Sequence, residues 1–169
     1  MYDVQHALNV SHISREIGRH LYMKEKELTI LYAAGLFHDI GKMIVPNGLL
    51  EKPVSLTSDE FIIIQWHTTL GHKILSQMPD EIHIIAAQAA LYHHERENGS
   101  GYLGLCGDNI PDVARIIAVA DVYDALIMDR PYRPKWSKAD ALMYIKNNAG
   151  LLFDDVIVEA FMNSIVIPS

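Results

Sequence analysis

Apolar side chains recur along nearly the whole chain at roughly the spacing of one helix face. The first segment shows this at Val4, Ala7, Leu8, Ile13, Ile17 and Leu21. The same periodicity predicts further helices over about residues 28–41, 57–77, 80–93, 112–128 and 137–150, with a last helix from about 154. Strand patterns have little support, so the sequence predicts an all-α fold, a compact bundle of about seven helices.

Glycine and proline mark the connections between these helices. A loop that contains Pro46, Gly48 and Pro53 follows the second helix, and Thr57 with Glu60 forms a capping box that opens the third. The connection over residues 98–111 is long and rich in glycine. Long loops inside compact domains usually carry function, so this segment is a candidate part of a site.

Length and composition describe one folded domain. The chain has 169 residues, 50% of them hydrophobic and 21% charged, and no linker divides it, so residues 1–169 are expected to form a single domain. The net charge of -7 argues against charge-driven binding to polymeric nucleic acid. No apolar run is long enough to span a membrane. The single cysteine, Cys106, excludes an intrachain disulfide, which favours a cytoplasmic location.

The candidate chemistry lies in the nine histidines of the chain. His93 and His94 are adjacent at a predicted helix end, beside the glycine-rich loop. Neighbouring helical residues point about 100° apart. Both imidazoles can therefore reach one metal ion only where the helix is ending, or else they approach it from different angles. Two histidines in such a place are hard to explain by packing.

Two further positions combine with this pair. His38 and Asp39 end an apolar helix, where a structural role and a ligand role are equally good explanations. Asp121 interrupts the apolar run 116–120, where a carboxylate is costly unless it is paired or bound to a cation; it is either a ligand or a buried cap partner. Imidazole with carboxylate suits Fe, Mn, Zn, Co or Ni.

Helix geometry removes some histidines from the candidate site. On an unbroken helix, His20 would lie about 21 Å from His6, so both cannot serve one site. His67 and His72 are five residues apart, and at most one of them should face the centre.

Taken together, these residues resemble the HD-GYP family of bacterial cyclic di-GMP phosphodiesterases, within the HD phosphohydrolase superfamily. The matching blocks, in order, are His38-Asp39-Ile40-Gly41-Lys42, His93-His94-Glu95-Arg96, Gly99-Ser100-Gly101-Tyr102, Ile110-Pro111, Ala118-Val119-Ala120-Asp121 and Asp129-Arg130-Pro131-Tyr132-Arg133. They cover nearly the whole chain, and their order makes the resemblance specific.

The resemblance implies an HD-domain helical bundle with a metal centre in its core. Its ligand positions are occupied by His6, His38, Asp39, His67, His93, His94 and Asp121. Asp39 is expected to bridge two divalent ions, Fe or Mn in the first place, with Zn, Ni and Co as alternatives. Members with three metals carry a glutamate where this chain has Tyr2, so we expect two ions.

The resemblance also implies a reaction, in which hydroxide bridging the metals attacks phosphorus and opens cyclic di-GMP to linear pGpG. Some three-metal members continue to GMP, so for two ions a stop at pGpG and a further step to GMP are both open. Asp39 and Lys42 are the expected catalytic residues, although Lys42 is otherwise a solvated loop lysine. Lys42, Tyr102, Arg130 and Arg133 are the expected substrate contacts. For Tyr102 the alternative is loop packing, and for the two arginines it is a surface turn. Glu95 and Arg96 are expected to orient the imidazoles of the ligands.

One departure from the family lies in the signature loop. Leu103 follows Gly101 and Tyr102 where the family has proline, which puts substrate affinity and partner contacts in doubt. Two alternatives to the first reading therefore stay open: hydrolysis of another nucleotide, such as a mixed cyclic dinucleotide, or a catalytically weak module that binds cyclic di-GMP. The expected partners are a second copy of the chain, an upstream sensory or receiver domain and GGDEF-type signalling proteins. The chain is either a domain that stands alone or a fragment that lacks such an upstream domain.

Overall fold

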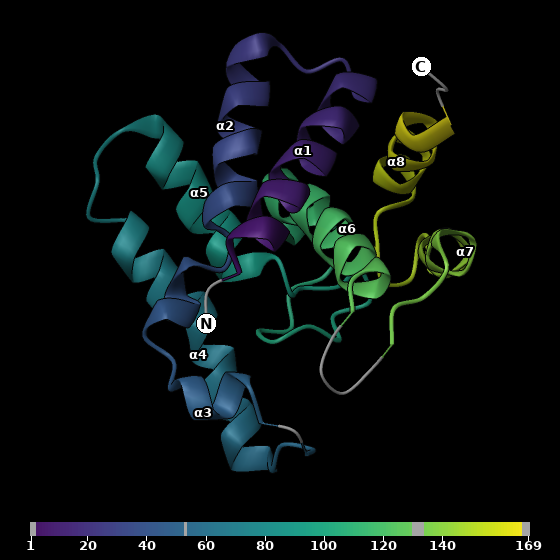
Figure 1. The fold of residues 1–169 in the computed structure, drawn as a ribbon. Helices are drawn as coiled ribbons and strands as arrows, with labels where there is room; N and C mark the ends of the chain where they lie inside the picture. The colour runs from purple at the N-terminus through teal and green to yellow at the C-terminus, as the bar shows by residue number, and fades with distance from the viewer. Residues whose placement is uncertain (1–2, 53, 130–133, 167–169) are drawn as a thin grey trace.

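A computed structural model describes residues 3–52, 54–129 and 134–166, and they fold as a helical bundle (Figure 1). Its α-helices are α1 Val4–His20, α2 Glu25–Phe37, α3 Asn47–Leu50, α4 Ser58–Leu75, α5 Glu81–Tyr92, α6 Asp112–Ile127, α7 Lys138–Asn147 and α8 Asp155–Val166. Two short 3₁₀-helices, η1 Ile40–Met43 and η2 Gly107–Asn109, lie in the connections. No strand occurs among these described residues, so the predicted all-α class is confirmed.

The seven predicted helices are all present, and the main difference concerns the second one. It was expected to run to Gly41, but α2 ends at Phe37 and the chain tightens into η1. In η1 the chain comes close to α4, where a Cβ added to Gly41 would lie 1.9 Å from the backbone oxygen of His67. The short helix α3 lies within the segment predicted as a loop.

Helix α6 forms the centre of the bundle, with α1, α5, α7 and α8 packed against it (Figure 1). Ile117, Val119 and Ala120 are completely buried in the core that these helices share. Burial on nearly all sides explains why α6 is apolar around most of its circumference. Any polar side chain that points inward from α6 must therefore find partners on the neighbouring helices.

Side-chain caps fix where the helices begin. The Thr57–Glu60 capping box predicted from the sequence is formed at the start of α4. The Asp3 carboxylate accepts a hydrogen bond from the backbone N–H of His6, which places His6 in the first turn of α1. No helix in the described ranges is both long and apolar enough to cross a membrane.

Candidate metal centre

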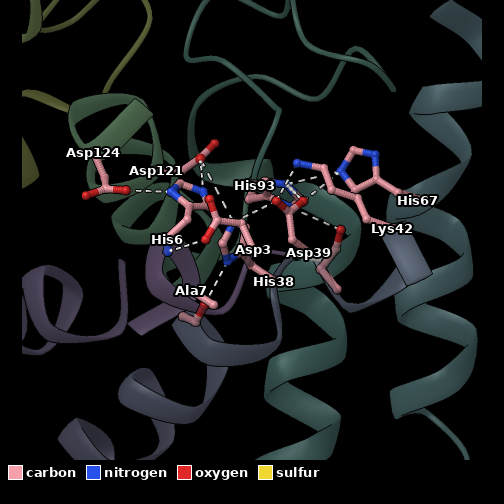
Figure 2. Close-up of polar contacts among 12 residues, drawn as sticks. Asp3, His6, Ala7, His38, Asp39, Lys42, His67, His93, Asp121 and Asp124 are labelled. Carbon is pink, nitrogen blue, oxygen red and sulfur yellow. Dashed lines mark hydrogen bonds and ion pairs between the residues drawn. The ribbon is translucent and has the colours of Figure 1, made fainter. Parts of the chain in front are cut away.

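The seven side chains predicted as metal ligands lie together where five segments of the bundle converge. Figure 2 labels all of them except His94. His6 comes from α1, and His38 and Asp39 follow the end of α2. His67 lies on α4, His93 and His94 follow α5, and Asp121 lies on α6. Segments far apart in the sequence thus contribute to one buried cluster of imidazoles and carboxylates.

The described residues of the cluster form three groups of potential ligand atoms, of which two share no residue and the third, His38, Asp39 and His93, links them. His6, His38 and Asp121 form the first, called here the His6 group. Nε2 of His6 is 3.0 Å from Oδ1 of Asp121, and Nε2 of His38 is 3.9 Å from the same oxygen.

The second group consists of His67, His93 and His94 and is called here the His67 group. The Nε2 atoms of His67 and His93 are 3.4 Å apart. The imidazole of His94 lies beside both rings. Both adjacent histidines can take part because α5 ends at Tyr92, so His93 and His94 are already in the turn that follows.

Asp39 lies between the two groups and faces both. Its Oδ2 is 3.4 Å from Nε2 of His38, in the His6 group. Its Oδ1 is 3.3 Å from Nε2 of His67 and 3.7 Å from Nε2 of His93. One carboxylate therefore offers a separate oxygen to each group, which is the geometry of a bridging ligand.

The spacing of these atoms fits divalent cations. With donors about 2.1 Å from an ion, neighbouring donors are roughly 3.0–3.5 Å apart and opposite ones about 4.2 Å apart. The six distances given above run from 3.0 to 3.9 Å. Nε2 of His38 and Oδ1 of Asp39 are buried without a hydrogen-bond partner in the described parts of the chain. Such atoms are costly to bury, and a cation would satisfy both.

Backbone carbonyls orient three of the imidazoles. Nδ1 of His38 lies 2.7 Å from the carbonyl oxygen of Gly35, and Nδ1 of His67 lies 2.6 Å from that of Ile64. Nδ1 of His93 is 3.0 Å from the oxygen of Ala89. When Nδ1 carries the proton and donates to these oxygens, the lone pair of Nε2 points into the cluster.

Glycine allows the glycine-rich loop to approach the site. A Cβ on Gly101 would lie 2.4 Å from Cα of Glu95 and 2.7 Å from the backbone oxygen of His94. Both oxygens of Glu95 accept hydrogen bonds from this loop, from the backbone N–H groups of Leu103 and Leu105 at 2.8 Å each. Glu95 thus holds the signature loop against the turn that carries His94.

The charges of the cluster depend on burial and on neighbours. Burial lowers the pKa of His67 and His93, and it lowers that of His94 to about 3, so these imidazoles are neutral near pH 7. Burial alone would also lower the pKa of His6, but hydrogen bonds with Asp121 and Asp124 outweigh it and raise the pKa to about 10.

The two carboxylates of the cluster stay ionised although they are buried. Burial acts to raise the pKa of Asp39, but Lys42 and His38 hold it well below the usual range. For Asp121, His6 and His38 have the same effect against burial. The neutral imidazoles of the His67 group therefore face the negative carboxylate of Asp39, as a cation site requires.

Lys42 and Tyr102, two of the expected substrate contacts, lie at this cluster. The ammonium group of Lys42 forms an ion pair with Oδ2 of Asp39. The ring centroid of Tyr102 lies 4.5 Å from that of His94 and 5.9 Å, edge to face, from that of Phe61 on α4. Arg130 and Arg133 lie outside the described residues.

Arg96 and Asp124 contact residues of the site without belonging to the predicted ligand set. The guanidinium of Arg96 lies over the ring of Phe153, 5.6 Å from its centre, and donates to the backbone oxygen of Glu95. Asp124 was not singled out in the sequence, yet its carboxylate is buried and lies 2.6 Å from Nδ1 of His6. The available signal was its position three residues after Asp121, on the same face of an apolar helix.

Comparison with known proteins agrees with this geometry. The HD domain family matches residues 3–157, and the chain belongs to that family. It is 41% identical over 154 residues to the cyclic di-GMP phosphodiesterase response regulator RpfG of Xanthomonas campestris, covering 90% of this chain and 41% of that protein. It is 36% identical over 145 residues to 3'3'-cGAMP-specific phosphodiesterase 2 of Vibrio cholerae, covering 85% of this chain and 28% of that protein.

A solved structure supports the fold. The chain superimposes on Bd1817, an HDG"Y"P protein from Bdellovibrio bacteriovorus, with a TM-score of 0.76 and 20% identity, covering 96% of this chain and 52% of the other. The resemblance stated from the sequence motifs is confirmed by these matches. The chain spans less than half the length of the two curated relatives named above.

Proposed function

We propose that this chain is a metal-dependent phosphodiesterase that hydrolyses cyclic di-GMP to linear pGpG, with GMP as a further product. The position of Asp39 carries the proposal, because each of its oxygens faces a different group of ligand atoms. Two ions held side by side stabilise the attacking and leaving oxygens of a phosphoryl transfer. The similarity to RpfG, whose name states this activity, supports the choice of substrate.

The two groups would hold two divalent ions, with Fe or Mn as the first candidates. The His6 group would bind one and the His67 group the other, with Asp39 shared between them. When bound, such ions supply an activated water and neutralise charge on the phosphate. The donor set contains nitrogen and oxygen but no thiolate, which suits Fe, Mn, Zn, Co or Ni.

The chain's own residues would position the substrate. Lys42 would release Asp39 and place its ammonium group on a non-bridging phosphate oxygen. Tyr102 lies beside His94, so a purine base bound over its ring would be adjacent to the metal groups. Arg130 and Arg133 remain proposed contacts to phosphate or to guanine edges.

Product analysis tests the proposal. Protein purified without oxygen and loaded with Fe(II) or Mn(II) should convert cyclic di-GMP to pGpG, and chelator-treated protein should not. Protein that binds cyclic di-GMP and metal but gives neither pGpG nor GMP would refute the enzymatic proposal and point to a binding module.

A second candidate substrate is 3'3'-cGAMP, because a relative 36% identical to this chain is named for that activity. Measuring kcat/KM for both dinucleotides under the same metal loading decides between them. The second copy of the chain, the upstream sensory or receiver domain, the GGDEF-type partners and the cytoplasmic location stay predictions.

A further inference from the structure

His6 is held differently from His38, His67 and His93, whose Nδ1 atoms each lie against a carbonyl oxygen of their own helix. Its Nδ1 lies 2.6 Å from Oδ2 of Asp124, which is 118 positions away on α6 (Figure 2). The orientation of His6 therefore depends on a tertiary contact between α1 and α6. No local turn of α1 could supply it, because His6 lies in the first turn of that helix.

The carboxylate of Asp124 is buried and both of its oxygens are used. Its side chain is 1% exposed, and its Oδ1 accepts a hydrogen bond from Nδ2 of Asn9 at 2.8 Å. Asn9 lies about one turn after His6 on α1, and its own side-chain oxygen accepts a hydrogen bond from Gln5. A buried carboxylate is expensive unless it is paired, and here all of its partners named above come from one face of α1.

We propose that Asp124 is a positioning residue of the metal centre, with Asn9 holding it in place. The contact with Asp124 orients the ring of His6 so that its Nε2 faces Asp121, at 3.0 Å from Oδ1. A carboxylate on the far nitrogen also makes an imidazole a stronger ligand than a carbonyl does. The inference rests on the proposed two-ion function and assigns Asp124 to the ion of the His6 group alone.

Metal titration of three variants tests this inference. Mn(II) is titrated calorimetrically into metal-free wild type, Asp124→Asn, Asn9→Ala and Asp80→Asn. Asp80→Asn is the matched control, because Oδ2 of Asp80 makes the same 2.6 Å contact with Nδ1 of His83 at the surface. Asparagine is also an effective N-cap, so α5 keeps its start in that control.

We expect Asp124→Asn to lower the binding affinity for one of the two Mn(II) ions by roughly 10–100-fold and to leave the affinity for the other unchanged. Asn9→Ala should lower the affinity for the same ion by a smaller factor, and Asp80→Asn should bind both ions as wild type does. A purely structural role would instead lower both affinities together, and that result would overturn the inference. Unchanged affinities in Asp124→Asn would overturn it as well.

The folding of Asp124→Asn and the number of ions bound by wild type give two further outcomes. If circular dichroism shows that Asp124→Asn does not fold, Asn9→Ala carries the test: selective weakening supports the inference, and equal or absent weakening overturns it. If wild type binds only one ion, the two-ion proposal fails. The role of Asp124 is then supported if Asp124→Asn lowers the affinity for that ion, and it is overturned if the affinity is unchanged.

Discussion

The His6 group and the His67 group contain the same kinds of side chain but are built in different ways. In the His67 group, the imidazoles of His67 and His93 are oriented by carbonyls of their own helices and are neutral because they are buried. In the His6 group, His6 lies between the carboxylates of Asp121 and Asp124 on another helix. Local backbone therefore orients His67 and His93 in the His67 group. In the His6 group a carbonyl of its own helix orients His38, whereas His6 depends on the docking of α1 on α6.

Removing the shared ligand should have the largest effect, because it acts on both groups. In the proposed two-ion mechanism, Asp39→Ala should lower turnover of cyclic di-GMP by at least about 1000-fold, since several kcal/mol of transition-state stabilisation would depend on the ions. Steady-state kinetics with metal analysis measures this. Asp59→Ala, an exposed residue in the first turn of α4, is the control and should behave as wild type. Retained turnover in Asp39→Ala would contradict the metal mechanism.

Single ligand removals should separate the two groups. His6→Ala should lower the affinity for one ion by more than about 100-fold, and His67→Ala should lower the affinity for the other. The effect is large because direct ligands contribute more to metal affinity than their supporting partners do. Competition titration with Mn(II) on each variant and on the double variant gives the comparison. Equal weakening of both ions in either single variant would show that the groups do not act as separate sites. His72→Ala, at a partly exposed histidine on α4 five residues after His67, serves as the control.

In the metal-free protein, the contributions of the two groups to the free energy of unfolding should change with pH in opposite directions. The pKa of His6 is raised to about 10, so its stabilising contribution is full below about pH 6.5 and is lost as pH rises through 10. The pKa values of His67, His93 and His94 are lowered, so their contribution is lost as pH falls below about 6.5.

Urea denaturation at a series of pH values between 5 and 10, with all other conditions constant, measures the free energy of unfolding at each pH. We expect His6→Gln to abolish most of the loss of unfolding free energy on the alkaline side and to leave the acid side unchanged. An alkaline limb that is identical in His6→Gln and wild type would show that another group titrates there.

The smallest effect concerns the loop that Glu95 holds beside the His67 group. Leu103→Pro restores the residue that the family carries, but it removes the backbone N–H that donates to Oε1 of Glu95. We expect the free energy of unfolding to fall by about 1–3 kcal/mol, measured by chemical denaturation. Leu103→Ala keeps the N–H and should differ little from wild type, because Leu103 is half exposed. A more stable Leu103→Pro would show that proline fits this loop.

The sequence by itself determined the helices and the kinds of ligand. Apolar periodicity gave the seven main helices, and the capping box at Thr57 located the start of α4. The pairs His38–Asp39 and His93–His94, with Asp121 in an apolar run, identified imidazole and carboxylate donors at helix ends and in the core. These features are local, so the chain encodes them within a few residues of each site.

Only the tertiary structure decided how these side chains share the site. It showed that each oxygen of Asp39 faces a different group, and that Gly41 allows η1 to lie against α4 closely enough for this. It also brought Asp124 to His6 across 118 positions of sequence. Periodicity reports which face of a helix is buried but not which atom of another helix meets it. The close packing of the whole bundle makes that choice.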